Sequence, residues 1–275
     1  MKIGLIAGGG QFPLLFAGKA AEKGIEVTAV GFYSETDETL PALVDDFKWL
    51  YLGQVSKMVK FFKAKGIDQA VMLGSIQKTN IFKDIRPDFK ALAFIARTGR
   101  THDDNVLTSF ADLLLKEGIQ IRPSTFLLPE LISPRGSWTR RSPDRAEKKD
   151  IYQGWKIARE IGRLDIGQCI VISNGTILAV EAIDGTDATI RRGGGLSHKS
   201  GAVVVKLSKP GQDLRFDLPS SGLGTIRTMA DSGARVLALE AERSISFDRK
   251  EMVDLADRHG IAIIGLIDED IPSES

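Results

Sequence analysis

The sequence predicts an α/β protein with two domains, an N-terminal Rossmann-like domain built on a parallel sheet and a second, mixed α/β domain. Strand and helix patterns alternate over residues 1–122, which is typical of a parallel sheet covered on both faces. Residues 123–143 contain four prolines and a basic polar stretch, and they predict a linker. Residues 144–275 mix hairpin and crossover patterns, which indicates a separate second domain.

The N-terminal elements follow from apolar runs, helical spacing and stop residues. Short apolar runs predict strands over residues 3–7, 26–31, 49–52, 69–74 and 119–122. Apolar residues at helical spacing predict helices over 13–23, 55–65, 89–97 and 104–116. Pro13 suits the first turn of its helix, where a missing N–H costs little, and Gly24 suits the C-terminal cap.

The second half begins with a predicted helix over 144–162, followed by a hairpin. Its two apolar runs, 169–173 and 176–180, are joined by Asn174-Gly175, a pair that suits the positive φ angles of a type I′ turn. Further strands are predicted over 202–206, 213–218, 235–240 and 261–267. Helices over 225–231 and 249–258 separate some of them, so we expect a sheet with both parallel and antiparallel strands.

Composition excludes several classes of function. Lys and Arg number 37 against 36 Asp and Glu, so no net charge attracts nucleic acid and we expect no such partner. Cys169 is the single cysteine, which excludes a disulfide framework and a cysteine zinc site, and its apolar strand predicts a packed core thiol. The three histidines show no ligand spacing. Without a signal peptide or a membrane-length apolar run, the sequence predicts a cytoplasmic protein.

Three glycines, Gly8, Gly9 and Gly10, follow the first predicted strand. They supply two glycines of a dinucleotide fingerprint, but Pro13 stands at the third position and no acidic residue ends the second strand. NAD binding is therefore disfavoured, and a Walker loop is excluded because no Gly-Lys-Ser/Thr follows. Two readings remain: backbone N–H groups that approach a phosphate at a helix N-terminus, or a tight turn without a ligand.

Acidic and basic residues gather in two segments of the second half. The first segment carries Glu181, Asp184, Asp187, Arg191 and Arg192, and the second carries Asp213, Arg215 and Asp217. Loop carboxylates are typical ligands of Mg²⁺, and arginines bind phosphate through paired hydrogen bonds, which together indicate a metal-assisted phosphoanhydride hydrolase. The alternative is structural: Asp184-Gly185 is a common turn pair, and surface charges are usually solvated.

Three further segments give weaker indications. His102-Asp103-Asp104 resembles a polar site, but Asp103 suits the N-cap of the next helix equally well. Residues 191–201 resemble an anion-binding loop, although we favour a mobile surface loop. Trp138 with Arg140-Arg141 suggests an amphipathic contact, and here a linker is the favoured interpretation.

Four segments carry a family resemblance that spans nearly the whole chain. They are GLIAGGGQFP near the start, AREIGRLDIGQ (158–168), LAVEAIDGTDATIRR (178–192) and DLRFDLPSSG (213–222). In this order they resemble the UDP-2,3-diacylglucosamine pyrophosphatases of lipid A biosynthesis, in the lineage unrelated to calcineurin-like phosphoesterases. The two middle segments are long and distinctive, whereas the opening glycines alone would not identify the family.

The resemblance implies a reaction and its setting. UDP-2,3-diacylglucosamine and water would give UMP and 2,3-diacylglucosamine 1-phosphate (lipid X), with water attacking the phosphorus on the sugar side. It further implies Mg²⁺ as cofactor, a nucleotide-binding domain over 1–122, a catalytic domain over 144–275 and substrate between them. A homodimer is expected, and the lipid substrate predicts peripheral contact with the inner membrane.

The resemblance also implies particular site residues. The family's essential aspartate, in an Asp-Leu-Pro motif, falls on Asp217, and its Thr-Asp pair falls on Thr186 and Asp187. Asp217 and Asp187 are the expected Mg²⁺ ligands. The expected substrate-binding residues are Gly8, Gly9, Gly10, Gln11, Gln168, Arg191 and Arg192. Two departures, Ser220-Ser221 after the proline and the glycines at 193–195, concern local loop geometry more than the chemistry.

Two other functions stay open from the residues alone. A non-catalytic carrier or sensor of a nucleotide or lipid would show slow-dissociating lipid without turnover. A Rossmann-type dehydrogenase would bind NAD(H) at micromolar level, and Pro13 argues against it.

Overall fold

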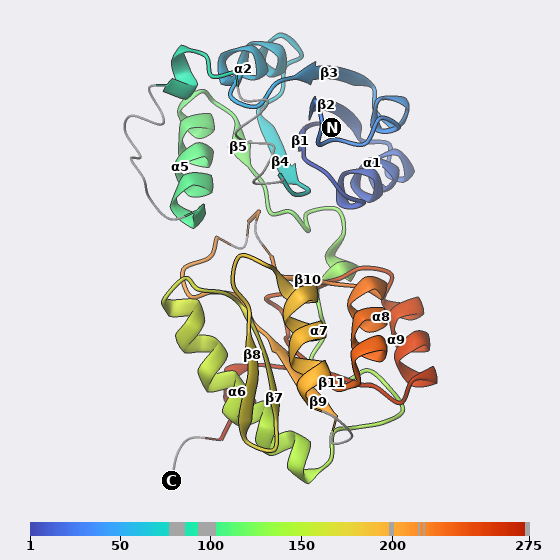
Figure 1. Ribbon diagram of the computed structural model, residues 1–275. Helices are drawn as coiled ribbons and strands as arrows, with labels where there is room; N and C mark the ends of the chain where they lie inside the picture. The colour runs from blue at the N-terminus through green and yellow to red at the C-terminus, as the bar shows by residue number, and fades with distance from the viewer. Residues whose placement is uncertain (77–85, 93–102, 198–200, 214, 217, 273–275) are drawn as a thin grey trace. The chain divides into compact units, whose positions relative to one another are not determined.

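The computed structural model describes residues 1–76, 86–92, 103–197, 201–213, 215–216 and 218–272, with side chains from residue 107 in the helix that begins at 103. The chain divides into two compact units (Figure 1). The first unit comprises Met1–Pro129 together with Asp213–Asp217, and the second comprises Glu130–Gln212 together with Leu218–Ser275. A short segment of the second half of the sequence therefore belongs to the first unit.

The first unit contains the predicted parallel sheet, in the order β3-β2-β1-β4-β5. Every neighbouring pair in this sheet is parallel, which confirms the Rossmann-like prediction. The strands are β1 (Lys2–Ala7), β2 (Glu26–Phe32), β3 (Asp46–Leu50), β4 (Gln69–Leu73) and β5 (Gln120–Ile121). The order reverses between β1 and β4, and such a switch point is where ligands bind in open α/β sheets.

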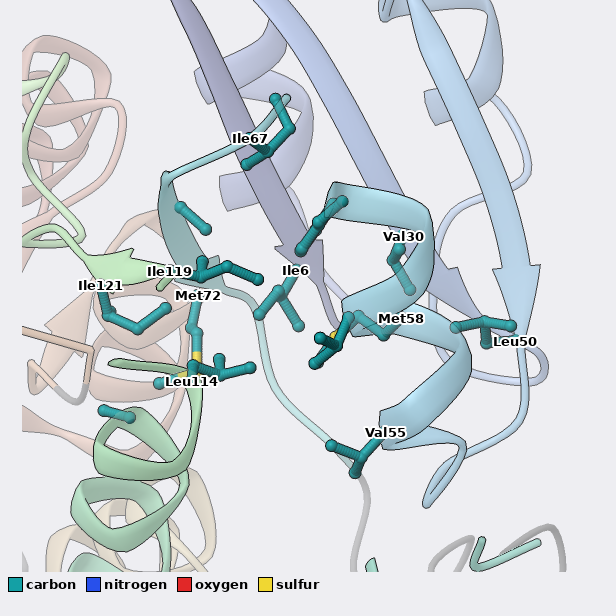
Figure 2. Packing of buried hydrophobic residues seen from close by; sticks show 14 of the residues in the cluster. Ile6, Val30, Leu50, Val55, Met58, Ile67, Met72, Leu114, Ile119 and Ile121 are labelled. Atoms are coloured by element: carbon teal, nitrogen blue, oxygen red, sulfur yellow. The ribbon is translucent and has the colours of Figure 1, made fainter. Parts of the chain in front are cut away.

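Apolar helix faces cover the strands of this unit. The helices are α1 (Phe12–Glu22), the 3₁₀ helix η1 (Leu40–Leu43), α2 (Val55–Ala64) and α5 (Asp103–Lys116). Met58 on α2 and Leu114 on α5 meet Ile6 and Met72 of the sheet in a continuous buried cluster (Figure 2). Of the predicted helix 89–97, residues 89–92 are helical and the others lie outside the described residues.

The second unit has a mixed sheet in the order β6-β13-β11-β9-β7-β8, which confirms the predicted fold class. β9, β11 and β13 are mutually parallel, whereas β6, β7 and β8 each pair antiparallel with their neighbours. The strands are β6 (Gly136–Ser137), β7 (Cys169–Ser173), β8 (Thr176–Val180), β9 (Ala202–Lys206), β11 (Ala234–Glu240) and β13 (Ala262–Leu266). A short parallel ribbon joins β10 (Ser220–Ser221) and β12 (Ile245–Ser246).

Helices pack on both faces of this sheet. One face carries α7 (Thr186–Leu196), α8 (Leu223–Ser232) and α9 (Arg249–Arg258), whose apolar residues share a cluster with β7, β9 and β11. The other face carries α6 (Arg145–Arg163), which buries Ile151 and Trp155. Asp144 and Glu147 form a reciprocal capping box at the start of α6, so this helix begins where its sequence predicts. Two 3₁₀ turns, η2 (Pro129–Leu131) and η4 (Asp268–Asp270), complete the described elements.

The predicted β7–β8 hairpin is confirmed. β7 and β8 pair antiparallel, and Asn174 and Gly175 take φ angles of 50° and 76°. The buried carboxylate of Asp150 accepts hydrogen bonds from the N–H groups of Asn174 (2.8 Å) and Gly175 (2.7 Å). Tertiary contact with α6 therefore fixes a turn that the local sequence already favours.

Two sequence-based expectations are wrong. The described residues of 213–218 form no strand, because Phe216 packs against the core of the first unit instead of joining a sheet. Residues 191–196 are part of α7 and not a surface loop. The glycines there serve packing: a Cβ on Gly193 would lie 2.4 Å from Cβ of Val171, and one on Gly194 would lie 2.5 Å from the Ser232 carbonyl oxygen. Residues 198–200 lie outside the described residues.

The proline-rich stretch 123–143, predicted as a linker, also contributes a strand to the second sheet. β6 lies within it and pairs with β13, and the Trp138 N–H donates to the Ile263 carbonyl at 2.9 Å. Trp138 also packs against the apolar cluster beneath α7, α8 and α9. The second unit thus begins at Glu130, within the stretch predicted as a linker.

Candidate functional site

One edge of the second sheet gathers charged and polar side chains. β8 runs parallel to β9, so their carboxyl ends share this edge with the amino end of β7. Glu181 follows β8, Lys206 ends β9, Gln168 precedes β7 and Thr186 begins α7. Open α/β sheets bind ligands beyond the carboxyl ends of their strands. This edge is therefore the candidate site of the second unit.

The Glu181 side chain links two other residues of this edge through hydrogen bonds. Its side chain is buried, accepts a hydrogen bond from Thr186 Oγ1 at 2.8 Å, and accepts another from the Gln168 N–H at 3.2 Å. Gly167 permits this approach, because a Cβ there would lie 2.2 Å from the Glu181 carbonyl oxygen. The predicted residues Thr186 and Gln168 are thus brought together by a carboxylate to which the sequence assigned no definite role.

The first turn of α7 presents Thr186 and Asp187 at this edge. Gly185 precedes the helix with φ of 81°, a left-handed value that favours glycine. Asp187 is exposed, and its carboxylate lies at the positive end of the helix dipole.

Burial raises the pKa of the Cys169 thiol, and the nearby Glu181 carboxylate raises it further, so Cys169 is a neutral core thiol as predicted.

Lys206 is a further charged group at this edge and one that the sequence analysis missed. Its side chain is buried, with 5% of the residue exposed, and Nζ donates to the Ser220 carbonyl oxygen at 2.7 Å. In the register of β7 and β9, Lys206 lies directly opposite Cys169. The only signal in the sequence was a lysine that ends the apolar run AVVVK.

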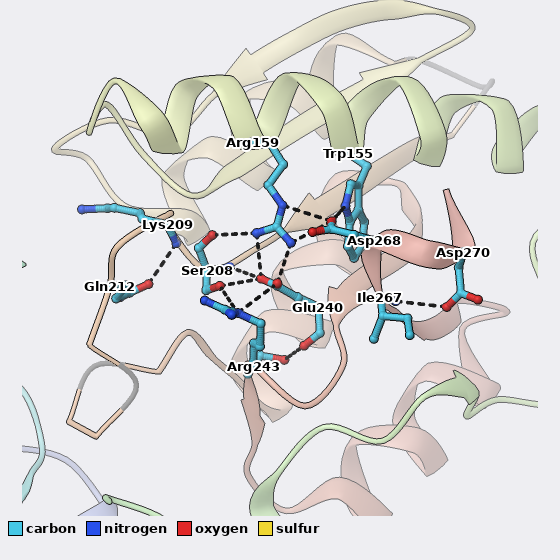
Figure 3. Close-up of polar contacts among 11 residues, drawn as sticks. Trp155, Arg159, Ser208, Lys209, Gln212, Glu240, Arg243, Ile267, Asp268 and Asp270 are labelled. Atoms are coloured by element: carbon cyan, nitrogen blue, oxygen red, sulfur yellow. Dashed lines mark hydrogen bonds and ion pairs between the residues drawn. The ribbon is translucent and has the colours of Figure 1, made fainter. Parts of the chain in front are cut away.

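Glu240, at the carboxyl end of β11, is the second residue that the sequence analysis missed. Its carboxylate is 2% exposed and accepts hydrogen bonds from Arg159 NH2, the Ser208 N–H and Ser208 Oγ (Figure 3). Asp268 accepts from Trp155 Nε1 and from the Arg159 guanidinium. These contacts raise the pKa of Arg159 despite its partial burial, so the guanidinium stays charged.

The segment around Asp217 lies in the first unit. The Asp213 carboxylate accepts a hydrogen bond from the Arg215 guanidinium at 2.6 Å. Its Oδ2 also accepts one from Thr108 Oγ1 on α5 at 3.4 Å. The bond from Arg215 holds the pKa of Asp213 below its usual range. The Arg215 carbonyl accepts from the Ser124 N–H at 2.6 Å. Asp217 itself lies outside the described residues.

The two predicted phosphate-binding arginines differ in their surroundings. Arg192 forms an ion pair with Asp184 and donates to the Val180 carbonyl at 2.9 Å. The hydrogen bond from Arg192 to the Asp184 carboxylate lowers the pKa of Asp184. Arg191 is exposed at the preceding position of α7. Arg192 therefore links α7 to the end of β8, whereas the Arg191 side chain is exposed to solvent.

The glycine loop of the first unit is held by backbone pairing. The Gly8 N–H donates to the Leu73 carbonyl at 2.8 Å, and Gly9 and Ser75 exchange hydrogen bonds at 2.8 and 3.0 Å. A Cβ on Gly8 would lie 2.6 Å from the Ser75 carbonyl oxygen. The glycines therefore allow the loops after β1 and β4 to touch at the switch point. Gly10 takes φ of 90°, and Gln11 is the N-cap of α1.

The second unit's edge offers one exposed carboxylate of the kind that Mg²⁺ takes as a ligand. Within the described part of the chain, no three His, Cys, Asp or Glu side chains converge as a ready-made metal cluster. Mg²⁺ commonly takes one or two protein carboxylates and completes its shell with water and substrate phosphate. The exposed Asp187 carboxylate meets that requirement for one ligand.

Comparison with known proteins gives matches over nearly the whole chain. Residues 2–131 match the family described as the LpxI N-terminal domain, and residues 134–264 match the LpxI C-terminal domain. The chain is 33% identical over 281 residues to UDP-2,3-diacylglucosamine pyrophosphatase LpxI of Caulobacter vibrioides, which covers 98% of this chain and 99% of that protein. No helix among the described residues is long and apolar enough to cross a membrane.

Similarity to solved structures is partial. The biotin carboxylase subunit of a pyruvate carboxylase is 15% identical with a TM-score of 0.26, over 62% of this chain and 34% of that one. Glycinamide-RNase-transformylase T from Mycobacterium tuberculosis is 11% identical with a TM-score of 0.25, over 66% and 44%. The chain spans less than half the length of either protein.

Proposed function

Because this chain belongs to the LpxI family, as the resemblance of four sequence segments predicted, we propose that it hydrolyses the pyrophosphate bond of UDP-2,3-diacylglucosamine. It is a pyrophosphatase of lipid A biosynthesis, and its products are UMP and lipid X. The observation that carries this function is the 33% sequence identity to a UDP-2,3-diacylglucosamine pyrophosphatase, which extends over both units of the chain.

The reaction is a hydrolytic displacement at phosphorus. The oxygen of water bonds to the sugar-side phosphorus while the bond from that phosphorus to the bridging oxygen breaks, and UMP leaves with the bridging oxygen. Asp217 holds the metal or takes a proton from the attacking water. Bound Mg²⁺ would neutralise charge on the phosphate oxygens.

The described residues support roles for the start of α7. The hydrogen bond between Thr186 and the buried Glu181 holds the first turn of the helix, which carries Asp187. Asp187 is the proposed second Mg²⁺ ligand, and Thr186 binds phosphate or the metal. Exposed Arg191, one helical turn on, offsets phosphate charge, and Arg192 does so once its pair with Asp184 opens.

The glycine loop is the proposed site for the UDP part of the substrate. It lies at the switch point between β1 and β4, where nucleotides bind in related topologies. Gly8 and Gly9 place this loop against the loop after β4, and Gly10 and Gln11 lie at the start of α1, where a helix N-terminus favours a phosphate. A homodimer with peripheral contact to the inner membrane completes the proposal, and light scattering and vesicle sedimentation test these two features.

Turnover of the lipid substrate tests this function. Purified protein with Mg²⁺ should release UMP from UDP-2,3-diacylglucosamine, and EDTA should stop the release. In ¹⁸O water the label should appear in lipid X and not in UMP. Asp217→Ala should lower kcat by ~100-fold or more, as expected for loss of a group that acts on the reacting atoms.

Two results would contradict the proposal. Stoichiometric bound lipid without turnover under any divalent metal would favour the non-catalytic carrier. Unimpaired turnover by Asp217→Ala would refute the role of Asp217 but leave the function in place. Asp254→Ala, at an exposed position on α9, is the matched control and should keep wild-type rates.

A further inference from the structure

Lys206 is a buried cation that forms no ion pair with any described residue. It ends β9, is 5% exposed, and donates one hydrogen bond from Nζ to the Ser220 carbonyl oxygen at 2.7 Å. An ammonium has three N–H donors, and this bond uses one of them. Buried charges are normally paired with an opposite charge, because removal from water is costly. Lys206 therefore has the properties of a group that binds an anion.

The Lys206 ammonium lies at the N-terminus of α8. Ser220 stands two residues before Gly222, the N-cap of this helix, so the hydrogen bond from Lys206 reaches the chain just ahead of the first helical turn. α8 has ten residues and no acidic side chain in its first turn. The unpaired N–H groups of a helix N-terminus carry partial positive charge and bind phosphate. A buried cation and the positive end of a helix therefore meet at one place.

A buried hydroxyl without a hydrogen-bond partner lies at the same place. Ser221 directly precedes the N-cap and is 4% exposed, and its Oγ has no partner in the described part of the chain. Most buried hydroxyls are hydrogen-bonded, because an unmet donor costs free energy. Rotation about the Cα–Cβ bond lets this hydroxyl donate to an anion held at the helix N-terminus. Ser221 thus indicates a ligand independently of the helix dipole.

α8 differs in its first turn from the neighbouring helix α7. The two helices pack against each other, and both begin at the carboxyl edge of the sheet, after β9 and β8 (Figure 1). The first turn of α7 carries the Asp187 carboxylate, which repels an anion unless a metal is bound. Besides burial and Glu181, the charges of Lys206 and Asp187 act on the pKa of the Cys169 thiol, so both lie near that core residue. α7 therefore offers a metal ligand, and α8 offers donors for an anion.

We propose that Lys206, Ser221 and the first turn of α8 form a phosphate-binding site of the second unit. Lys206 supplies the positive charge, and the Ser221 hydroxyl donates a hydrogen bond, as do the backbone N–H groups of Leu223 and Gly224. Gly224 is exposed, and a Cβ there would meet no atom within 4 Å, so a ligand can approach this turn. The ligand is a phosphate group, on either the sugar side or the nucleotide side of the scissile bond. The inference rests on the proposed function, because the substrate of that reaction supplies the phosphate.

Binding of soluble phosphate esters to the full chain tests the site. Glucosamine 1-phosphate carries the phosphate of the sugar-side product without its acyl chains, and UMP carries that of the nucleotide side. The ester that uses the site should shift the backbone amide signals of Leu223, Gly224 and Thr225 in a ¹⁵N NMR titration of the wild type. Glucosamine and uridine, which lack the phosphate, should leave these signals in place. If neither ester shifts them, the inference is overturned.

Lys206→Met removes the cation with little change in side-chain volume. The Kd of the bound ester, measured by calorimetry, should rise about 10- to 100-fold, as expected for loss of a charge-assisted hydrogen bond. The kcat/KM for the lipid substrate should fall by a similar factor. Lys250→Met removes a lysine from an exposed ion pair on α9 and should keep wild-type values. An unchanged Kd in Lys206→Met would contradict the proposal.

Ser221→Ala separates binding from folding. Loss of a hydroxyl that only supports the fold would lower Tm, whereas loss of a buried hydroxyl without a partner should keep or raise Tm. The Kd of the ester should still rise about 10-fold, because a hydrogen bond to the phosphate is lost. Ser133→Ala removes another buried hydroxyl without a described partner from the same unit and should leave the Kd unchanged. A lower Tm with an unchanged Kd in Ser221→Ala would refute the role of this residue.

Failure of the site is distinguishable from failure of the proposed function. If the wild type binds an ester at α8 but does not hydrolyse the lipid, the function fails and the phosphate site stands. If the wild type hydrolyses the lipid while Lys206→Met and Ser221→Ala keep its Kd and kcat/KM, only the site fails. Should Lys206→Met fail to fold, Ser221→Ala applies the same test in a variant that is expected to be stable.

Discussion

The two units hold their loops by different means. In the second unit, four charged side chains are buried among the described residues, and each binds a loop or turn: Asp150, Glu181, Lys206 and Glu240. In the described part of the first unit, the buried polar residues are uncharged: Thr28, Thr36 and Ser124. The same class of fold therefore fixes its loops with buried ions in one half and without them in the other.

The loops that follow β1, β2 and β4 in the first unit are held by backbone groups and a hydroxyl. Thr36 Oγ1 donates to the Ala7 carbonyl at 2.6 Å and accepts from the Phe32 N–H at 2.8 Å, which joins the ends of β1 and β2. Gly8 and Gly9 pair with the loop after β4. Here the backbones of two loops lie in direct contact, so the positions at the contact must be glycine. In the second unit, a long charged side chain can bind a loop whose backbone lies farther away.

The difference predicts which substitutions each unit tolerates. A buried charge cannot lose its partner without leaving an unpaired ion, so the second unit should be most sensitive at its ionic groups. A glycine at a backbone contact cannot gain a Cβ without moving a loop, so the first unit should be most sensitive there. Three substitutions test this comparison.

The largest effect is expected for Glu240→Ala. It leaves the Ser208 N–H and hydroxyl without their carboxylate in the interior, while Arg159 keeps Asp268 as a partner, so the free energy of unfolding of the second unit should fall by about 3 kcal/mol. Urea unfolding followed by exchange of the β9 and β11 amides measures it. Glu160→Ala, at an exposed pair on the same helix as Arg159, should change it by less than about 1 kcal/mol. Equal effects of the two substitutions would break the comparison.

A smaller effect is expected for Gly8→Ala in the first unit. The added Cβ would lie 2.6 Å from the Ser75 carbonyl oxygen, and displacement of that loop should cost about 1–3 kcal/mol. Exchange of the β1 and β4 amides reports on this unit alone. Gly18→Ala, on α1 where no atom lies within 4 Å of the new Cβ, should preserve or raise stability. Loss of stability at Gly18 as large as at Gly8 would refute close backbone contact as the cause.

The smallest effect concerns a surface carboxylate of the first unit. Hydrogen bonds from Lys63 and Lys90 lower the pKa of Glu117 from 4.5 to about 2. A lowered pKa contributes stability that is present above pH 4.5 and is lost as pH falls toward 2. Glu117→Gln should therefore cost at most about 1 kcal/mol at neutral pH, and less in high salt. Thermal unfolding against pH measures it, and a cost that grows on acidification would contradict the assignment.

Much of the fold was predictable because local patterns agree with tertiary demands. Apolar runs alternate with helical spacing over the first 122 residues, and the parallel sheet follows. Asn174-Gly175 predicts its hairpin because only particular residues suit two positive φ angles, and the structure shows both. The family was recognisable from four segments, and matches to both halves of the chain confirm it.

Other features were not predictable because the same residues serve different environments. The glycine run at 193–195 is typical of a loop, but two of its members lie in α7 against Val171 and Ser232. Residues 213–218 alternate like a strand, yet Phe216 belongs to the core of the other unit. Neither partner is close in sequence, so local pattern carries no signal for these contacts.

The sequence by itself determined the two α/β halves, the hairpin, the family and the candidate residues Thr186, Asp187 and Asp217, because periodicity, turn chemistry and motifs are local properties. Only the tertiary structure decided that Glu181 accepts a hydrogen bond from Thr186, that Lys206 binds Ser220 and Glu240 binds Ser208, and that Gly8 and Gly9 pair with another loop. Burial decides these roles, since the same lysine or glutamate on a surface would be solvated and without structural effect.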